Sequence, residues 1–221
     1  MNKKLKNIKL IIFDWSGVIS DDRYPVYLSN MELLKVRDIK TLTFIAWLKA
    51  SQINAIELVY SQGGTGDPDE IHKEYKETLD LIIKKGSTPR IYTGARKALK
   101  SLKNGGFLLA VGSSHPEENL KEDIKNYKLE DYFSYICGNL RDKVSGIKTV
   151  CEKLNVLPEN TLYIGDTVFD IRAAKGAGVK SAAITYGYHS KKRLESESPD
   201  LVLRKLSDLP PLLSIDKEAR I

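Results

Sequence analysis

The amino-acid sequence predicts an α/β protein, in which a parallel sheet carries helices on both faces and is interrupted by an inserted helical segment. Short apolar or β-branched runs alternate along the chain with segments of helical periodicity, a pattern typical of parallel sheets. The exception is the long stretch between the first strand and Tyr92, which has helical patterns but no convincing strand. These two observations indicate one α/β domain with a helical insertion.

Six runs have the length and composition of buried strands. In chain order they are residues 8–13, 108–112, 135–137, 161–164, 181–185 and 201–203. Apolar residues at helical spacing predict helices between these strands, over residues 95–102, 147–154 and 171–174. Glycines follow the first and the third of these helices, at Gly105 and Gly176, and they are typical helix stop signals.

The insertion contains two predicted helices, over residues 41–49 and 70–85, joined through the turn-rich segment 61–68. The Gly63-Gly64 pair in this segment predicts a flexible turn rather than a phosphate-binding loop, because no strand precedes it and no Gly-Lys-Ser/Thr follows. We therefore expect residues 1–20 and 88–221 to form the α/β core, and residues 21–87 to form a helical cap.

The composition is that of an ordinary globular chain, because 42% of its 221 residues are hydrophobic and 29% are charged. Its apolar runs are far shorter than the roughly 18 residues that a membrane span needs. The apolar stretch behind the N-terminal lysines is also too short for a signal peptide. We therefore expect a cytoplasmic protein without a membrane partner.

Charge and cysteine content exclude two further classes of site. The net charge is +6, but basic residues are interspersed with acidic ones, which favours a solvated surface over nucleic-acid binding. Cys137 and Cys151 lack metal-site spacing and predict small buried side chains. We expect no zinc and no nucleic-acid partner, and the sequence leaves the oligomeric state open.

Three predicted strands each run directly into a polar residue: Asp14, Ser113 and Asp166. In open α/β sheets, ligands bind at the carboxyl ends of the strands. An aspartate after a single strand is usually a turn former or a helix cap, but three polar strand ends in one sheet favour a site. We therefore expect these three side chains to converge.

The residues around two of these strand ends suit a phosphoryl group and a cation. Trp15-Ser16-Gly17 turns the backbone directly after Asp14, so that amide groups can face an anion and the carboxylate can attack phosphorus. Asp166 and Asp170 are four residues apart and share one face at the start of a helix.

Carboxylates brought together in this way need a positive partner. If Asp14 and Asp166 lie about 4 Å apart, they repel each other by roughly 4 kcal/mol at an effective dielectric of about 20. Both then stay ionised only beside a counter-charge. Oxygen ligands suit Mg²⁺, so the sequence predicts a magnesium site.

The segment after the second of these strands, Ser113-Ser114-His115-Pro116-Glu117, predicts a helix start with Pro116 in the first turn. The hydroxyls and amides of Ser113 and Ser114 would then be donors to phosphate. A plain helix cap would explain one of these serines but not both. His115, as a lone histidine, is expected at the surface.

Taken together, these motifs resemble the haloacid dehalogenase-like hydrolases. The first motif of that family, Asp-x-Asp-Gly-Thr/Val, is similar to Asp14-Trp15-Ser16-Gly17-Val18. Its second motif, a Ser or Thr at a strand end, is similar to Ser113, and its fourth is similar to the segment from Gly165 to Asp170. Lys143 matches the third motif best by position, with Lys148 as the alternative, because the usual Lys-Pro is absent.

The resemblance implies a Rossmann-like core with an α-helical cap and a nucleophilic Asp14 that forms an aspartyl-phosphate. It also implies a Mg²⁺ ion held by Asp14, the Ser16 backbone carbonyl and Asp166, with Asp170 in the outer shell of the metal. Ser113 and Lys143 would bind the phosphate, beside the donors that Ser114 offers. The phosphoglycolate phosphatase branch is the most similar, which implies hydrolysis of a small phosphorylated metabolite.

Ser16 departs from the family motif, because the phosphatases have there an aspartate that protonates the leaving group. General acid–base catalysis contributes roughly 10² to 10⁴ in rate. Asp21 or Asp22, which follow closely, could act as a substitute acid.

Two further functions remain open because of Ser16. One is C–P bond cleavage, since phosphonoacetaldehyde hydrolases have a similar Asp-Trp-Ala-Gly motif. That reaction needs a cap lysine, for which Lys35, Lys40 and Lys49 are candidates. The other is a phosphate-binding or regulatory protein with low turnover.

Overall fold

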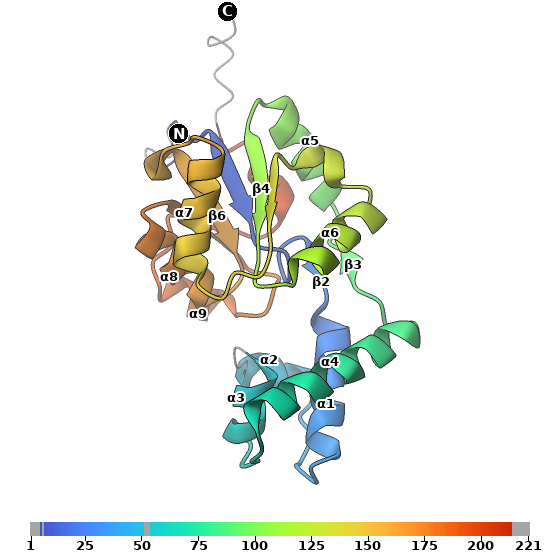
Figure 1. Ribbon diagram of the computed structural model, residues 1–221. Coiled ribbons are helices and arrows are strands. Elements are labelled where there is room, and N and C mark those ends of the chain that lie inside the picture. Colours follow the sequence, from blue (N-terminus) through green and yellow to red (C-terminus); the bar gives the residue numbers. More distant parts are fainter. Residues whose placement is uncertain (1–4, 6, 51–53, 214–221) are drawn as a thin grey trace, which may run out of the picture. The chain divides into compact units, whose positions relative to one another are not determined.

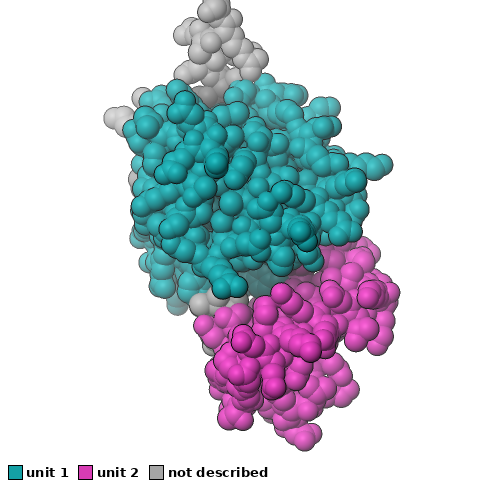
Figure 2. Space-filling view, in the orientation of Figure 1, with its two compact units in different colours: residues 1–19, 91–221 teal, residues 20–90 magenta. Residues whose placement is uncertain are grey.

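The computed structural model describes residue 5, residues 7–50 and residues 54–213 of the chain. The chain divides into two compact units (Figure 2). We call the unit of residues 1–19 and 91–221 the α/β unit, and that of residues 20–90 the helical unit. None of the described helices is both long and apolar enough to cross a membrane.

The α/β unit is built on a six-stranded sheet in the order β5-β4-β1-β6-β7-β8, and each neighbouring pair is parallel (Figure 1). Its strands are β1 (Leu10–Phe13), β4 (Leu108–Gly112), β5 (Tyr135–Cys137), β6 (Thr161–Gly165), β7 (Lys180–Ile184) and β8 (Leu201–Leu203). The predicted α/β class is confirmed. From β1 the chain builds outward to β4 and β5, and then returns to the other side of β1 to add β6.

Helices cover both faces of this sheet. Successive residues of β1 point to opposite sides, so each face contributes side chains to its own apolar cluster. Ile11 and Phe13 belong to the apolar cluster that packs under α5 (Ala95–Asn104) and α6 (Glu117–Asn126). Leu10 and Ile12 belong to the cluster under α7 (Lys143–Lys153) and α8 (Val168–Ala177). A central strand that is apolar on both faces reads as a continuous hydrophobic run, which is why the sequence revealed it.

The remaining elements of the α/β unit are short. They are α9 (Lys191–Glu195) and the 3₁₀ turns η2 (Glu130–Tyr132), η3 (Pro158–Asn160) and η4 (Leu206–Asp208). The two-residue strands β2 (Ser20–Asp21) and β3 (Arg90–Ile91) pair with each other where the chain leaves the α/β unit and returns to it.

The helical unit contains α1 (Arg23–Lys35), α2 (Phe44–Ala50), α3 (Ala55–Ser61) and α4 (Pro68–Lys84). The sequence predicted only the second and the fourth of these. The α1 helix escaped detection because it buries Ser29 and Asn30 beside its apolar residues, which breaks the apolar stripe. The Ser29 hydroxyl is satisfied by donating to the Tyr75 carbonyl of α4 at 3.0 Å. The α3 helix is only seven residues long.

Several predicted helix starts differ from the structure, those of α2, α4, α7 and α8 by two to four residues, and the place of Pro116 at the start of α6 differs as well. The α7 helix begins at Lys143, four residues before the predicted start, because the Asp142 side chain caps it by accepting from the Val144 amide. Pro116 lies at the N-cap of α6 and not in its first turn, so that prediction was wrong. Neither preceding serine caps the helix either, because the N-cap position of α6 has no side-chain hydrogen bond.

The start of α8 is fixed by three side chains. The Thr167 hydroxyl and the Asp170 carboxylate form a capping box. The His189 imidazole accepts a hydrogen bond at Nδ1 from the Val168 amide at 3.1 Å. Burial, and then the Arg193 charge, lowers the pKa of His189 from 6.5 to about 4, so this histidine folds as the neutral acceptor.

This histidine predicts a loss of stability in mild acid. Between pH 6.5 and about pH 4 the unfolded chain protonates His189 while the folded protein keeps it neutral, so the stabilisation present above pH 6.5 is lost as the pH falls. We expect the stability advantage of the wild type over His189→Asn to shrink across this window, as measured by urea denaturation at several pH values. His72→Asn, at an exposed position, is the control. A constant difference between wild type and His189→Asn would contradict the assignment.

Candidate active site

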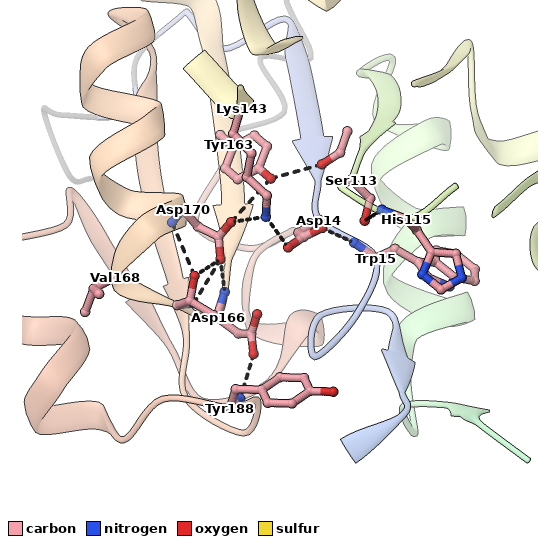
Figure 3. A network of polar contacts seen from close by, with 12 residues as sticks. Asp14, Trp15, Ser113, His115, Lys143, Tyr163, Asp166, Val168, Asp170 and Tyr188 are labelled. Carbon is pink, nitrogen blue, oxygen red and sulfur yellow. Dashed lines mark hydrogen bonds and ion pairs between the residues drawn. The ribbon is translucent and has the colours of Figure 1, made fainter. Parts of the chain in front are cut away.

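Asp14 follows β1 and is held at the carboxyl edge of the sheet. Its amide donates to the Ile164 carbonyl of β6 at 2.9 Å. Its Oδ1 accepts from the Trp15 amide at 2.8 Å (Figure 3). The side chain is buried. Burial raises the pKa of the Asp14 carboxyl, although the neighbouring Lys143 ammonium opposes this effect.

The turn after Asp14 depends on Gly17, which has a φ of +73°. The Trp15 carbonyl accepts from the Ile19 amide at 2.9 Å and closes this turn, in which Ser16 is half-buried. A Cβ atom on Gly17 would lie 2.1 Å from Oδ2 of Asp166. Glycine is therefore required here both for its backbone conformation and for the space beside the carboxylate.

Asp166 follows β6 and lies between two glycines. A Cβ atom on Gly187 would also lie 2.1 Å from its Oδ2, and the Tyr188 amide donates to the same oxygen at 2.6 Å. The segment 187–189 thus packs its backbone directly onto this carboxylate, and the His189 amide donates to the Asp166 carbonyl at 3.2 Å. No signal in the sequence revealed these contacts, because backbone amides supply them.

Asp14, Asp166 and Asp170 form a buried acidic cluster, with one oxygen from each lying within 4.8 Å of the others. Burial, and then the Asp170 and Asp14 charges, raises the pKa of Asp166 well above its usual range. Hard divalent cations bind carboxylate oxygens. Such an ion would also relieve the repulsion between these close, buried carboxylates. The donor set therefore fits such an ion.

Lys143, the first residue of α7, supplies the positive charge of the cluster. Its Nζ donates to Oδ2 of Asp14 at 2.7 Å and to Oδ1 of Asp170 at 2.6 Å (Figure 3). Against the effect of burial, these two carboxylates raise the pKa of Lys143 well above its usual range. The alternative, Lys148, lies on the same helix with an exposed side chain.

Asp170 is the most constrained of the three acids. Its Oδ2 accepts from the Thr167 hydroxyl at 2.6 Å, from the Thr167 amide at 2.9 Å and from the Asp166 amide at 3.2 Å. Although burial opposes the change, the Lys143 charge lowers the pKa of Asp170. Only its Oδ1 faces Lys143, so Asp170 joins the start of α8 to that ammonium.

The two serines after β4 have different environments. Ser113 is buried, its amide donates to the Cys137 carbonyl at 3.0 Å, and its Oγ accepts from the His115 amide at 3.3 Å. Ser114 is exposed. The imidazole of His115 is partly exposed and faces Asp123 of α6, with 3.9 Å between Nε2 and Oδ2.

Tyr163 is a residue of this site that sequence reasoning missed. It lies on β6 and is buried, and its hydroxyl donates to the Gly112 carbonyl at 3.0 Å. The same oxygen lies 3.5 Å from Oδ1 of Asp170. An aromatic residue in an apolar strand predicts core packing, so no pattern of side chains indicated this polar contact.

Comparisons with known proteins agree with this architecture. The family model described as haloacid dehalogenase-like hydrolase matches residues 11–184. A phosphoglycolate phosphatase from Mannheimia succiniciproducens is 26% identical over 217 residues, covering 91% of this chain and 96% of that protein. A phosphoglycolate phosphatase from Pseudomonas fluorescens is 32% identical over 169 residues, covering 74% of this chain and 57% of that protein.

Solved structures show the same fold. A haloacid dehalogenase-like family hydrolase from Streptococcus pneumoniae superposes with a TM-score of 0.81 at 18% identity, covering 94% of this chain and 99% of that one. A predicted phosphoglycolate phosphatase from Haemophilus somnus gives a TM-score of 0.79 at 21% identity, covering 95% of this chain and 100% of that one. Because the family model spans more than half of the sequence, the chain belongs to the haloacid dehalogenase-like hydrolases.

Proposed function

We propose that this hydrolase is a Mg²⁺-dependent phosphatase that acts on a small phosphorylated metabolite. One observation carries the proposal: Lys143 bridges Asp14 and Asp170 at the carboxyl edge of β1 and β6, with Asp166 beside them. Phosphoryl transfer needs a nucleophile together with positive charge around the transferred group. Phosphoglycolate phosphatases among the relatives support this class of substrate.

In the proposed reaction, an oxygen of Asp14 attacks phosphorus and the bond to the leaving alkoxide breaks, which gives an aspartyl-phosphate. Water then attacks the same phosphorus and returns the carboxylate with release of orthophosphate. The contacts with the Trp15 amide and Lys143 hold the Asp14 carboxylate in a fixed orientation for the first step.

The cation would be held by Asp14, Asp166 and the backbone carbonyl of Ser16. When bound, it would neutralise charge on the transferred phosphoryl oxygens. Asp170 supports these groups from the outer shell, because its Oδ2 already accepts from Thr167 and from the Asp166 amide. Gly17 and Gly187 leave room around Asp166.

Phosphate binding is proposed for Lys143 and the buried Ser113, with Ser114 as a further donor. We also propose that the helical unit is the cap expected over residues 21–87. A cytoplasmic location and the absence of a nucleic-acid partner stay predictions from the sequence.

Because Ser16 cannot protonate the leaving group, the choice of substrate depends on whether another residue supplies that proton. Asp21, one candidate substitute, is engaged in a two-point ion pair with Arg23 at 2.7 and 3.0 Å. Asp22, the other, is buried in the helical unit, where its charge adds to the effect of burial in raising the pKa of Tyr75. We therefore propose that substrates with good leaving groups react fastest.

The alternatives are not favoured. C–P bond cleavage needs a lysine that is desolvated and poised to form an imine, whereas Lys35, Lys40 and Lys49 are all exposed on the helical unit. The relatives named above are phosphatases. A protein that only binds phosphate would bind Mg²⁺ and orthophosphate without turnover, and the first experiment below separates that case.

Asp14→Asn tests the nucleophile. We expect it to lower kcat by at least about 10⁴-fold, because the amide cannot form the covalent intermediate. The measurement is orthophosphate release from a panel of phosphorylated metabolites, phosphonates and activated phosphate esters. Asp131→Asn, at an exposed aspartate outside the cluster, is the matched control and should keep wild-type activity. Undiminished turnover by Asp14→Asn would remove Asp14 from the mechanism.

Removal of divalent cations tests the metal site. Chelation should abolish turnover, and Mg²⁺ should restore it. Mg²⁺ at about 100 times its Kd should also stabilise the folded protein by about 2.7 kcal/mol, which is measurable as a rise in Tm. Asp166→Asn should lose this rise, whereas Asp131→Asn should keep it. A full Mg²⁺ response in Asp166→Asn would place the cation elsewhere.

Ser16→Asp tests the missing acid. If no other residue protonates the leaving group, this variant should hydrolyse alkyl phosphates roughly 10²-fold faster than the wild type, with little change for acyl or nitrophenyl phosphates. The measurement is the ratio of kcat/KM for the two classes of ester. An unchanged ratio would mean that another residue already supplies the proton.

A further inference from the structure

The side chain of Tyr163 reaches across the sheet. Tyr163 lies on β6 and Gly112 ends β4, and β1 lies between these two strands. In register, Ile12 of β1 is the partner of both Tyr163 and Ala110. The hydroxyl of Tyr163 therefore passes over β1 to donate to the Gly112 carbonyl at 3.0 Å (Figure 3).

Gly112 provides the surface on which the ring lies. A Cβ atom there would be 3.8 Å from Cε2 of Tyr163 and 3.2 Å from Cγ2 of Ile12. The tyrosine ring thus packs against the last residue before Ser113. Its hydrogen bond ties the backbone that carries Ser113 to the β6 side of the sheet.

The oxygen of the same hydroxyl faces the charged groups. It lies 3.5 Å from Oδ1 of Asp170, which accepts from Lys143 at 2.6 Å. A hydroxyl has one proton, and the shorter contact, to Gly112, takes it. The phenol oxygen then keeps its lone pairs, which can accept from a neighbouring donor such as the Lys143 ammonium. Burial, and then the Asp14 charge, raises the pKa of Tyr163 well above its usual range, so the phenol stays protonated and keeps donating.

We propose that Tyr163 is a positioning residue that sets the separation between the Ser113 end of β4 and the Lys143–Asp170 pair. This inference rests on the proposed function, in which Ser113 and Lys143 hold oxygens of one phosphoryl group. The two groups come from different elements, the β4–α6 loop and the start of α7. Tyr163 touches the backbone that carries Ser113 and the carboxylate that holds Lys143.

Filling the core would not by itself require the hydroxyl. Phenylalanine would fill the same space in the core, and a buried hydroxyl is costly unless it is hydrogen-bonded. The hydroxyl of Tyr163 makes its hydrogen bond at the carboxyl end of the strands, next to the candidate site. Its removal should therefore affect phosphate binding more than it affects folding.

Tyr163→Phe is the test. We expect KM and the inhibition constant of orthophosphate to rise together by about five- to tenfold, with kcat changed less than about threefold, because one neutral hydrogen bond is lost. Thr161→Val is the matched control. It removes another buried hydroxyl, which donates to the Leu157 carbonyl at 3.1 Å, from the first residue of the same strand.

The control should change Tm by an amount similar to that of Tyr163→Phe and leave the inhibition constant of orthophosphate unchanged. Orthophosphate binding within twofold of the wild type in Tyr163→Phe, or an equal weakening in Thr161→Val, would overturn the proposal. A wild-type protein without phosphatase activity would instead refute the proposed function. The positioning role would then be decided by calorimetric titration of orthophosphate into both proteins, where the same five- to tenfold difference is required.

Discussion

The contact of one ammonium with two carboxylates organises this molecule. Lys143, which is partly buried, lies between the buried Asp14 and Asp170, and the buried Asp166 lies beside them. Three carboxylates and one ammonium leave an excess of negative charge in a region of low dielectric, where repulsion is weakly screened. Burial, and then this imbalance, raises the pKa of Asp166, whereas the Lys143 charge, against the effect of burial, lowers the pKa of Asp170. A cation beside Asp14 and Asp166 would balance this excess of negative charge.

The topology of the sheet produces this crowding. Strands are added on one side of β1 and then on the other, so that the residues after β1 and β6 meet where the order reverses, which is the usual ligand site of such sheets. Side chains could not approach so closely without Gly17 and Gly187, which flank Asp166. The family to which the chain belongs shares this architecture, and residue 16 is where the sequence departs from its phosphatase motif. The chemistry of the leaving group is therefore the part of the mechanism in which this protein is expected to differ.

Much of the fold could be predicted because short stretches of sequence have the hydrophobic pattern of the element that they form. The six strands are short apolar runs, and the helices between them have apolar residues at regular spacing. Predictions about helices failed at α1 and at the start of α6. The α1 helix buries Ser29, whose partner lies on α4, so the pattern of α1 cannot be read without that neighbour. Pro116 suggested a first helical turn, although it is compatible with the N-cap as well.

The sequence by itself determined that Asp14, Ser113 and Asp166 lie at the carboxyl edge of one parallel sheet, because each directly follows a run that is apolar on both faces. Only the tertiary structure decided which lysine joins them, because Lys143 and Lys148 lie on the same helix and differ in the direction they face. It also decided the contacts of Tyr163 and of the segment 187–189. These contacts use a carbonyl and backbone amides from residues distant in sequence, and such groups are present at nearly every position and so leave no mark on the pattern of side chains.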